Sequence, residues 1–364
     1  MSRLLGLPLN MKMVILSRVP PKALARCRCV CKLLSELIVN PCFTKLYIDH
    51  AYKVNPKIMV TDLDCKYNYS LDAQVSSTNT RTRKLYLPYR IKRGSPGPIV
   101  VNGSCDGVIC ISNGEHCYLW SPTTRENSKL PNAPFKKPWR IQVPMFGFGC
   151  NRCTKEYKVV RFEYFMLTPQ EIKVYTCGTN LWRSTVQSSL PRHFLGSYNG
   201  VPQVNGALHW MGKGRVDPNK LFNLKNLNIP PSQYHTARRN PKEPNFIVAF
   251  KIEYEEILEI PWPNLLFDGV GFFDLCDLEG CLSLFRDNQD DGVEMWVMKQ
   301  YGVKESWVKL FIINLPPRLD FTKVLYVQNN SEYLLQSNGN KVKVISNNRV
   351  KLFSIVAIPT RFRE

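Results

Sequence analysis

The feature that most constrains the fold is a repeated pattern of short alternating strands that begins near residue 57. In each repeat an apolar run leads to a turn, an apolar strand follows, and two strands joined by a polar turn close the unit. A four-stranded unit cannot bury both faces alone, so several units are expected to stack radially into a propeller. The closing pairs start roughly 45–75 residues apart and occupy 117–130, 171–186, 246–261, 293–311 and 341–355.

Glycine-containing turns separate the first two strands of the repeats, at 100–103, 204–206 and 278–280. Glycine tolerates the positive φ that a tight hairpin needs, and the Asp-Gly pair at 106–107 also suits one. The period is irregular, so a β-sandwich or an incomplete propeller is an alternative. Tryptophans beside the strands are expected to fill the core between sheets; they are Trp120, Trp182, Trp210, Trp296 and Trp307.

The first 50 residues follow a helical pattern instead. Asn10 is the predicted cap of a first helix, which the Pro-Pro pair at 20–21 ends. A second helix is predicted from Lys22 to the Asn-Pro pair at 40–41, and a short third one over 42–50. The second helix carries one apolar stripe, made of Leu24, Cys27, Cys31, Leu34 and Ile38.

Further apolar residues of this helical head lie outside the stripe. A piece of this size cannot bury all its apolar surface alone, so they pack on the following domain or meet a partner. Periodicity alone leaves both possibilities open for Leu4, Leu5, Leu7, Pro8, Leu9, Val19, Pro20 and Val30. The predicted fold is α+β and multidomain: a small three-helix module at 1–50, then a mainly antiparallel, all-β, propeller-like domain at 51–364.

The head resembles an F-box in the order, spacing and proline positions of residues 7–8, 15–20, 22–24, 26–32, 37–38 and 41–43. An F-box is a helical docking module for the Skp1-type linker of cullin-based ubiquitin ligases. The resemblance therefore implies a Skp1-like partner and, through it, a cullin. It also implies an apolar docking face drawn from Leu7, Pro8, Ile15, Leu16, Val19, Pro20, Leu24 and Val30.

The head departs from the usual F-box pattern at three informative positions. Lys12 replaces an apolar residue, and its ammonium is costly to bury unless it reaches water. Val14 stands near the place of an acidic residue, and Leu34 stands where a tryptophan is common. These changes leave open a second function, that of a relative with lost or weak Skp1 binding that acts only as a protein-binding module.

The tail resembles the F-box-associated domain (type 1, kelch-like) that follows the F-box at the C-terminal side in a large plant family. The resembling pieces run in family order and lie at 102–110, 119–125, 146–149, 156–161, 205–210, 247–250 and 294–299. The implied role is substrate receptor of a Skp1–cullin–F-box (SCF) ubiquitin ligase. Such a receptor recruits a target protein for ubiquitination and contributes no catalytic group and no cofactor of its own.

Charge and cysteine content narrow the cellular setting. The net charge of +20 is spread along the chain and forms no single stripe, so nucleic acid is not the predicted partner. The 13 cysteines fit reduced thiols that pack as small apolar residues, because the chain is long and carries no secretory pattern. No apolar window is long enough to cross a bilayer, and cytoplasm or nucleus is the expected location.

Chemical motifs are weak in this sequence. Cys150 and Cys153 have the spacing of half a zinc site, but no second pair matches them, so no metal site is predicted. No nucleophile elbow or phosphate-binding glycine loop is present, which argues against an enzyme.

The most unusual stretch is 212–245, which is basic, contains several prolines and has a weak strand pattern. It reads as a long loop, either a mobile solvated insertion or a contact for an acidic substrate surface. The candidate substrate-binding residues there are Lys213, Arg215, Arg238 and Arg239.

Overall fold

The computed structural model describes residues 6–54, 57–61, 68–72, 83–87, 99–113, 116–134, 145–165, 168–185, 194–195, 201–213, 245–263, 272–288, 292–313, 321–328, 332–337, 341–346 and 349–354. These residues form two compact units, one ending at Tyr86 and the other beginning at Leu87. No helix among them is long and apolar enough to span a membrane.

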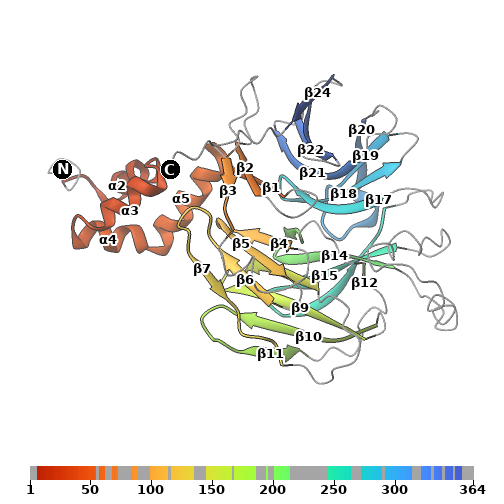
Figure 1. Cartoon of the computed structure of the whole chain (residues 1–364), viewed down its shortest axis with the longest axis horizontal. Helices are drawn as coiled ribbons and strands as arrows, with labels where there is room; N and C mark the ends of the chain where they lie inside the picture. Colours follow the sequence, from red (N-terminus) through yellow and green to blue (C-terminus); the bar gives the residue numbers. More distant parts are fainter. Residues whose placement is uncertain are drawn as a thin grey trace, which may run out of the picture. The chain divides into compact units, whose positions relative to one another are not determined.

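The first unit begins with four helices (Figure 1): α2 (Leu9–Ser17), α3 (Pro21–Arg28), α4 (Lys32–Val39) and α5 (Pro41–Val54). Proline sets several of their starts, since its fixed φ suits the first turn and its missing N–H costs nothing there. Pro8 is the N-cap of α2, and Pro21 and Pro41 are the first residues of their helices.

Two predictions for this region are wrong in detail. Asn10 lies within the first turn of α2, where Pro8 holds the cap position without a side-chain hydrogen bond. The long second helix is divided into α3 and α4, because the chain becomes extended at Cys31, with φ −157° and ψ 159°. Most of the apolar stripe survives this break, since Leu24 and Leu34 lie in one core and Cys31 and Ile38 pack against it.

That core is small and fully internal to the helical module. It consists of Leu16, Leu24, Leu34, Leu37 and Phe43, each at most 7% exposed. The Tyr47 hydroxyl donates a hydrogen bond to the Val19 carbonyl at 3.2 Å, which ties α5 to the segment between α2 and α3. The first unit also contains an antiparallel sheet of β1 (Lys57–Thr61), β2 (Asn68–Asp72) and β3 (Arg83–Leu85).

The second unit is built from antiparallel sheets that follow one another in chain order around a common centre (Figure 1). The first is β4 (Ile99–Cys105), β5 (Val108–Asn113), β6 (His116–Trp120) and β7 (Asn127–Lys129). The second is β8 (Met145–Cys150), β9 (Tyr157–Phe165), β10 (Thr168–Thr176) and β11 (Trp182–Thr185). The third is β12 (Phe194–Leu195), β13 (Gln203–Val204), β14 (Ala207–Lys213), β15 (Asn245–Lys251) and β16 (Glu256–Ile260).

Two further four-stranded sheets complete the described part of this unit. One is β17 (Phe272–Leu278), β18 (Cys281–Asn288), β19 (Gly292–Met298) and β20 (Trp307–Ile313), which the short helix η2 (Lys304–Ser306) precedes at β20. The other is β21 (Phe321–Gln328), β22 (Glu332–Ser337), β23 (Lys341–Ser346) and β24 (Arg349–Ser354). The propeller-like antiparallel fold is confirmed, and each predicted closing pair corresponds to the last two strands of one sheet.

The tight turns explain the hairpin register. Asp106 and Gly107 have φ of 51° and 78°, and the pairs at 205–206 and 279–280 have similar positive values. Two consecutive positive φ angles define the turn that matches the twist of antiparallel strands. The predicted turn at 100–103 is wrong, because β4 continues through Gly103 to Cys105, with a register shift between Val101 and Gly103.

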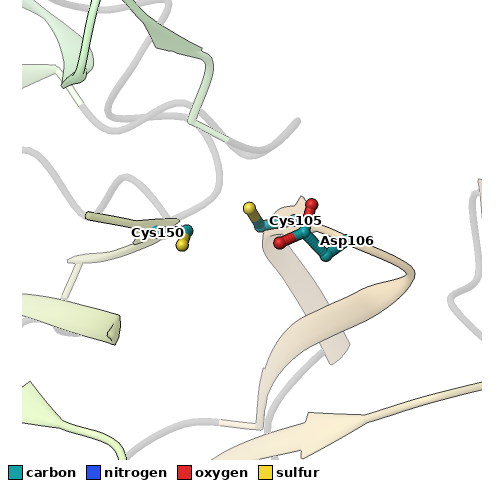
Figure 2. Close-up of side chains that lie close together, drawn as sticks. All are labelled: Cys105, Asp106 and Cys150. Carbon is teal, nitrogen blue, oxygen red and sulfur yellow. The ribbon is translucent and has the colours of Figure 1, made fainter. Parts of the chain in front are cut away.

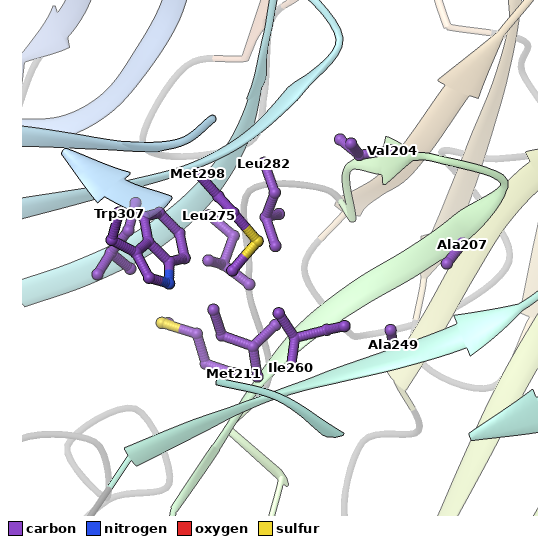
Figure 3. Close-up of a cluster of buried hydrophobic side chains, with 11 residues drawn as sticks. Val204, Ala207, Met211, Ala249, Ile260, Leu275, Leu282, Met298 and Trp307 are labelled. Atoms are coloured by element: carbon purple, nitrogen blue, oxygen red, sulfur yellow. The ribbon is translucent and has the colours of Figure 1, made fainter. Parts of the chain in front are cut away.

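Buried apolar side chains fill the spaces between neighbouring sheets. Figure 3 shows the cluster between the third and fourth sheets, where Met211 and Ile260 face Leu275, Met298 and Trp307. Between the second and third sheets, the rings of Phe162 and Trp210 meet edge to face with centroids 4.7 Å apart.

The predicted burial of the tryptophans is confirmed in full for three of them and in part for two. Trp120, Trp210 and Trp307 are at most 8% exposed. Trp182 and Trp296 are half-buried.

Candidate functional site

The helical module exposes an apolar surface even after its own core is complete. We call this set the module surface; its side chains are 44–60% exposed and are Leu9, Met11, Val14, Ile15, Val30, Leu33 and Val39. Exposed apolar residues that gather on one small module indicate a protein-binding site.

Helix α2 shows most clearly why this surface exists. Leu16 is 2% exposed and points into the core, whereas Val14 and Ile15 are 45% and 44% exposed. A helix that only covered its own core would be polar on the opposite side. Because α2 is apolar on both sides, one side is left for another molecule.

The residues predicted to bind a Skp1-type partner divide into two groups. Leu16 and Leu24 lie in the internal core, at 2% and 7% exposure, so their side chains are not part of the exposed surface. Pro8, Ile15, Pro20 and Val30 are exposed, and Leu7 and Val19 are half-buried. The predicted docking residues did not include five members of the module surface, which are Leu9, Met11, Val14, Leu33 and Val39. None of them belongs to the apolar stripe, and an apolar residue outside the stripe was the available signal.

Two positions that depart from the F-box pattern, Lys12 and Leu34, are buried in the helical module. Lys12 is 9% exposed, so most of its side chain lies against the module. Leu34 is 2% exposed in the internal core, so its identity affects the packing of the module and not the exposed surface.

In the second unit, one edge of the sheets gathers a series of tight turns, which we call the turn edge. Antiparallel strands alternate in direction, so the turn after the first strand and the turn after the third lie at the same edge of a sheet. The turn edge comprises residues 106–107, 121–126, 151–156, 177–181, 205–206, 252–255, 279–280 and 299–306.

Side chains at the turn edge join neighbouring sheets. The Tyr157 hydroxyl donates to Asp106 Oδ2 at 2.9 Å, across the first and second sheets. The backbone N–H of Cys150 donates to Gln203 Oε1 at 3.0 Å, and Gln203 Nε2 donates to the Cys150 carbonyl at 2.7 Å. These bonds hold three successive sheets in a fixed relation at this edge.

An ion-pair network strengthens the same region. Lys158 Nζ lies 2.8 Å from Glu255 Oε1, and their side chains are 8% and 13% exposed. Arg183 reaches the same oxygen at 2.7 Å from the exposed side. Lys158 Nζ also donates a hydrogen bond to the Ile252 carbonyl at 3.2 Å. The buried ammonium therefore has both an ion-pair partner and a hydrogen-bond acceptor.

Around this network the turn edge exposes two large apolar side chains, Leu181 at 69% and Tyr254 at 67%. The exposed charges at the edge are of both signs, with Arg152 and Lys155 among the bases and Glu253 among the acids. The described part of this edge is therefore not a basic stripe for a nucleic-acid backbone.

The turn edge also brings two thiols and a carboxylate together (Figure 2). The ligand atoms of Cys105, Asp106 and Cys150 all lie within 4.8 Å of one another. The interaction with Cys105 is the main cause that lowers the pKa of the Cys150 thiol, and it raises the pKa of Cys105. Cys153, which the sequence paired with Cys150, is exposed and lies outside this group.

The predicted basic substrate loop falls largely outside the described residues. Lys213 is the last residue of β14 and pairs with Asn245 at the start of β15. It therefore lies at the edge opposite to the turn edge. Arg215, Arg238 and Arg239 are beyond the described part of the chain, so their role stays a prediction.

Comparison with known proteins identifies the two parts of the chain. Residues 57–361 match the family described as F-box associated beta propeller domain, and residues 4–46 match the F-box domain. The chain belongs to the family of proteins with an F-box associated beta propeller domain. Its F-box is followed by an F-box-associated domain, and proteins of this family are generally non-catalytic adaptors.

Relatives align with the F-box protein over most of its length. F-box protein CPR1 of Arabidopsis thaliana is 26% identical over 362 residues, which cover 92% of this chain and 81% of the relative. F-box/kelch-repeat protein At3g23880 of Arabidopsis thaliana is 25% identical over 344 residues, with 91% and 85% covered. Both alignments cover more than nine tenths of this chain.

Proposed function

We propose that this F-box protein is the substrate-recognition adaptor of an SCF ubiquitin ligase. The F-box would bind a Skp1-like linker, and through it a cullin, while the F-box-associated domain holds a target protein. The ligase would gain from the high effective concentration of the target near the ubiquitin-charged enzyme. The adaptor itself contributes no catalytic group and needs no cofactor.

The module surface is the observation that carries this proposal. Its seven side chains remain exposed although the module already has a closed core of its own. An apolar surface next to a completed core fits a protein partner, because its burial gains free energy that the module cannot obtain alone.

The test is a substitution on that surface that spares the core. Ile15→Asp places a charge on an exposed position of α2, and we expect it to reduce binding of a Skp1-type linker at least tenfold, or about 1.4 kcal/mol. The matched control is Lys32→Asp, which adds the same residue at a side chain that is 92% exposed. Binding is measured by calorimetry with the purified full chain.

Circular dichroism of both variants checks that the helices persist. Leu16→Asp is unsuitable here, because Leu16 is a core residue and its substitution would unfold the module. If Ile15→Asp binds the linker as tightly as Lys32→Asp, the docking surface has been assigned to the wrong residues.

The same measurement distinguishes the second candidate function. A wild-type chain that is folded but does not bind any Skp1-type linker would act only as a protein-binding module. The buried Lys12 is the feature that favours this alternative, because burial of a charged side chain in the helical module is costly.

For the target, we propose an acidic protein surface that the basic loop contacts through Lys213, Arg215, Arg238 and Arg239. Loops on a rigid scaffold commonly carry recognition, and this loop joins two paired strands. The proposed location is cytoplasm or nucleus, in keeping with the free thiols of the described cysteines. A fluorescent fusion of the full chain tests that location.

A further inference from the structure

The cluster of two thiols and one carboxylate at the turn edge is not used by the adaptor function. Cys105 and Asp106 are supplied by the end of β4 and the turn after it, and Cys150 by the end of β8. In Figure 2 the Cys105 sulfur points from its ribbon toward Cys150 on the neighbouring strand. The three donors thus belong to two different sheets.

We propose that Cys105, Cys150 and Asp106 form a binding site for one Zn²⁺ ion that joins the first two sheets of the propeller. Zinc prefers thiolate ligands in tetrahedral sites, with about 2.3 Å between metal and sulfur. Two sulfurs on one zinc then lie about 3.8 Å apart, which agrees with donor atoms within 4.8 Å of one another. Water supplies the fourth ligand at the exposed side.

The backbone brings the two thiols together without strain. β4 lies beside β8, and the approach is close at Gly103, where an added Cβ would lie 3.0 Å from the Phe148 carbonyl oxygen. Cys105 and Cys150 each follow two residues later on their strands. Side chains two residues apart on a strand share a face, so the close approach at Gly103 continues to the two thiols.

The Asp106 carboxylate is also positioned to bind the metal. Asp106 has a φ of 51°, so it sits in the left-handed region of a tight turn. The Tyr157 hydroxyl donates to Asp106 Oδ2 at 2.9 Å and leaves the second carboxylate oxygen for a metal. Hydrogen bonds of this kind orient the ligands of metal sites, and Gln203 fixes the backbone of Cys150 in the same way.

Neighbouring charges favour the loaded site. Two thiolates and one carboxylate exceed the charge of Zn²⁺ by one negative unit. Arg152 and Lys155 are exposed residues of the turn that follows Cys150, so they bring positive charge to this part of the turn edge. On binding, the two thiol protons leave to solvent and the sulfurs bind the metal, so no oxidant or reductant is needed.

The experiment uses the full chain, reduced and stripped of metal by a chelator, and titrates it with Co²⁺ and then Zn²⁺. We expect one equivalent of Co²⁺ to give thiolate-to-cobalt charge-transfer absorption, which Zn²⁺ abolishes by displacement. Cys150→Ser is expected to weaken cobalt binding at least about tenfold and to reduce the charge-transfer intensity. Asp106→Asn is expected to weaken binding while both thiolate bands persist.

Cys153→Ser is the matched control, because Cys153 is an exposed thiol of the same turn outside the cluster. It should leave the affinity unchanged. A Cys105→Ser variant, at a half-buried position, repeats the test if Cys150→Ser alters the circular dichroism spectrum.

The proposal is overturned if the wild type gives no charge-transfer band. It is also overturned if the Cys105→Ser, Cys150→Ser double variant binds cobalt as tightly as the wild type. A loss with Cys153→Ser equal to that with Cys150→Ser would reject this set of ligands. These outcomes do not depend on linker or substrate binding, so the adaptor proposal stands or fails separately.

Discussion

At the level of single residues, His209 is a titratable group that the propeller-like domain buries between two sheets. None of its side chain is exposed. Its Nδ1 lies 3.3 Å from the Pro202 carbonyl oxygen, which can only accept, so this nitrogen carries the hydrogen. Nε2 then accepts a hydrogen bond from the Tyr301 hydroxyl at 2.7 Å. This arrangement fits a neutral imidazole.

Burial is the main cause that lowers the pKa of His209 from 6.5 to about 4, and Lys251 acts in the same direction. The unfolded chain therefore binds a proton at a pH where the folded chain does not. The stability that this histidine contributes is complete above about pH 6.5 and is lost as the pH falls toward 4. We expect the loss to be about 3 kcal/mol.

Urea unfolding of the wild type and of His209→Gln at pH 7 and pH 4.5 measures this effect. Carboxylates that titrate in the same range contribute to both proteins, so the difference between the two pH slopes isolates the histidine. The variant is expected to be less stable at pH 7 and less sensitive to acid. Equal slopes would contradict a buried neutral His209.

Individual residues were also the hardest feature to predict. The Asn-Gly pair at 102–103 has the composition of a turn, yet it lies inside β4, because Gly103 is needed for the approach to Phe148. Asn10 has the chemistry of a cap, but Pro8 already ends the extended segment before α2. In both cases the residue type has the predicted local preference, for a turn or for a helix cap, but a contact or residue nearby determines the backbone conformation.

At the level of elements, runs of β-branched and aromatic residues between turn residues predicted the strand pairs well, although β5, β8 and β15 are buried on both faces. Val174, Val248 and Trp296 pair with Arg183, Glu259 and Lys309 on the last strands of their sheets. The break between α3 and α4 was missed, because Cys27 and Cys31 continue the helical spacing although the backbone does not.

Packing between elements gives a further prediction at Gly147 in β8. A Cβ at this position would lie 2.4 Å from Trp210 Cζ2 and 3.1 Å from Leu208 Cδ1, both on β14. Gly147→Ala therefore overpacks a core in which Trp210 is 1% exposed. We expect the free energy of unfolding to fall by about 2 kcal/mol.

The control uses the atom that causes the clash. Trp210→Phe removes the outer ring of the indole, so Gly147→Ala should cost much less in that background. Chemical unfolding of the four proteins in this double-mutant cycle gives the coupling energy. A cost that is the same in both backgrounds would show that the contact with Trp210 is not the cause.

At the level of the whole molecule, the sequence predicted two parts with different periodicities but not the sites that arise when sheets meet. Cys150 was noticed only beside Cys153, its neighbour in sequence. Its spatial partners Cys105 and Asp106 are on another sheet, and only the stacking of β4 on β8 places them there. In the same way, periodicity did not tell which apolar residues of the helical module complete its own core.

The adaptor proposal requires two partner-binding surfaces that can be lost one at a time. The module surface belongs to the first unit, and the basic loop is inserted between two strands of the second. Because Lys213 and Asn245 are directly paired, replacing 214–244 by Asn-Gly closes the hairpin with a two-residue turn. The sheet should therefore stay intact when the loop is removed.

Affinity purification from cells treated with a proteasome inhibitor, followed by mass spectrometry, compares three forms of the chain with wild type. Ile15→Asp should lose the linker and cullin but retain substrates. The loop replacement, and separately the charge reversal Arg238→Glu with Arg239→Glu, should retain the linker and lose substrates, because an acidic target no longer meets a basic loop. If the charge-reversed chain keeps every substrate, the loop is a solvated insertion and another part of the domain recognises the target. Leu181 and Tyr254, which are exposed at the turn edge, are then the next residues to substitute.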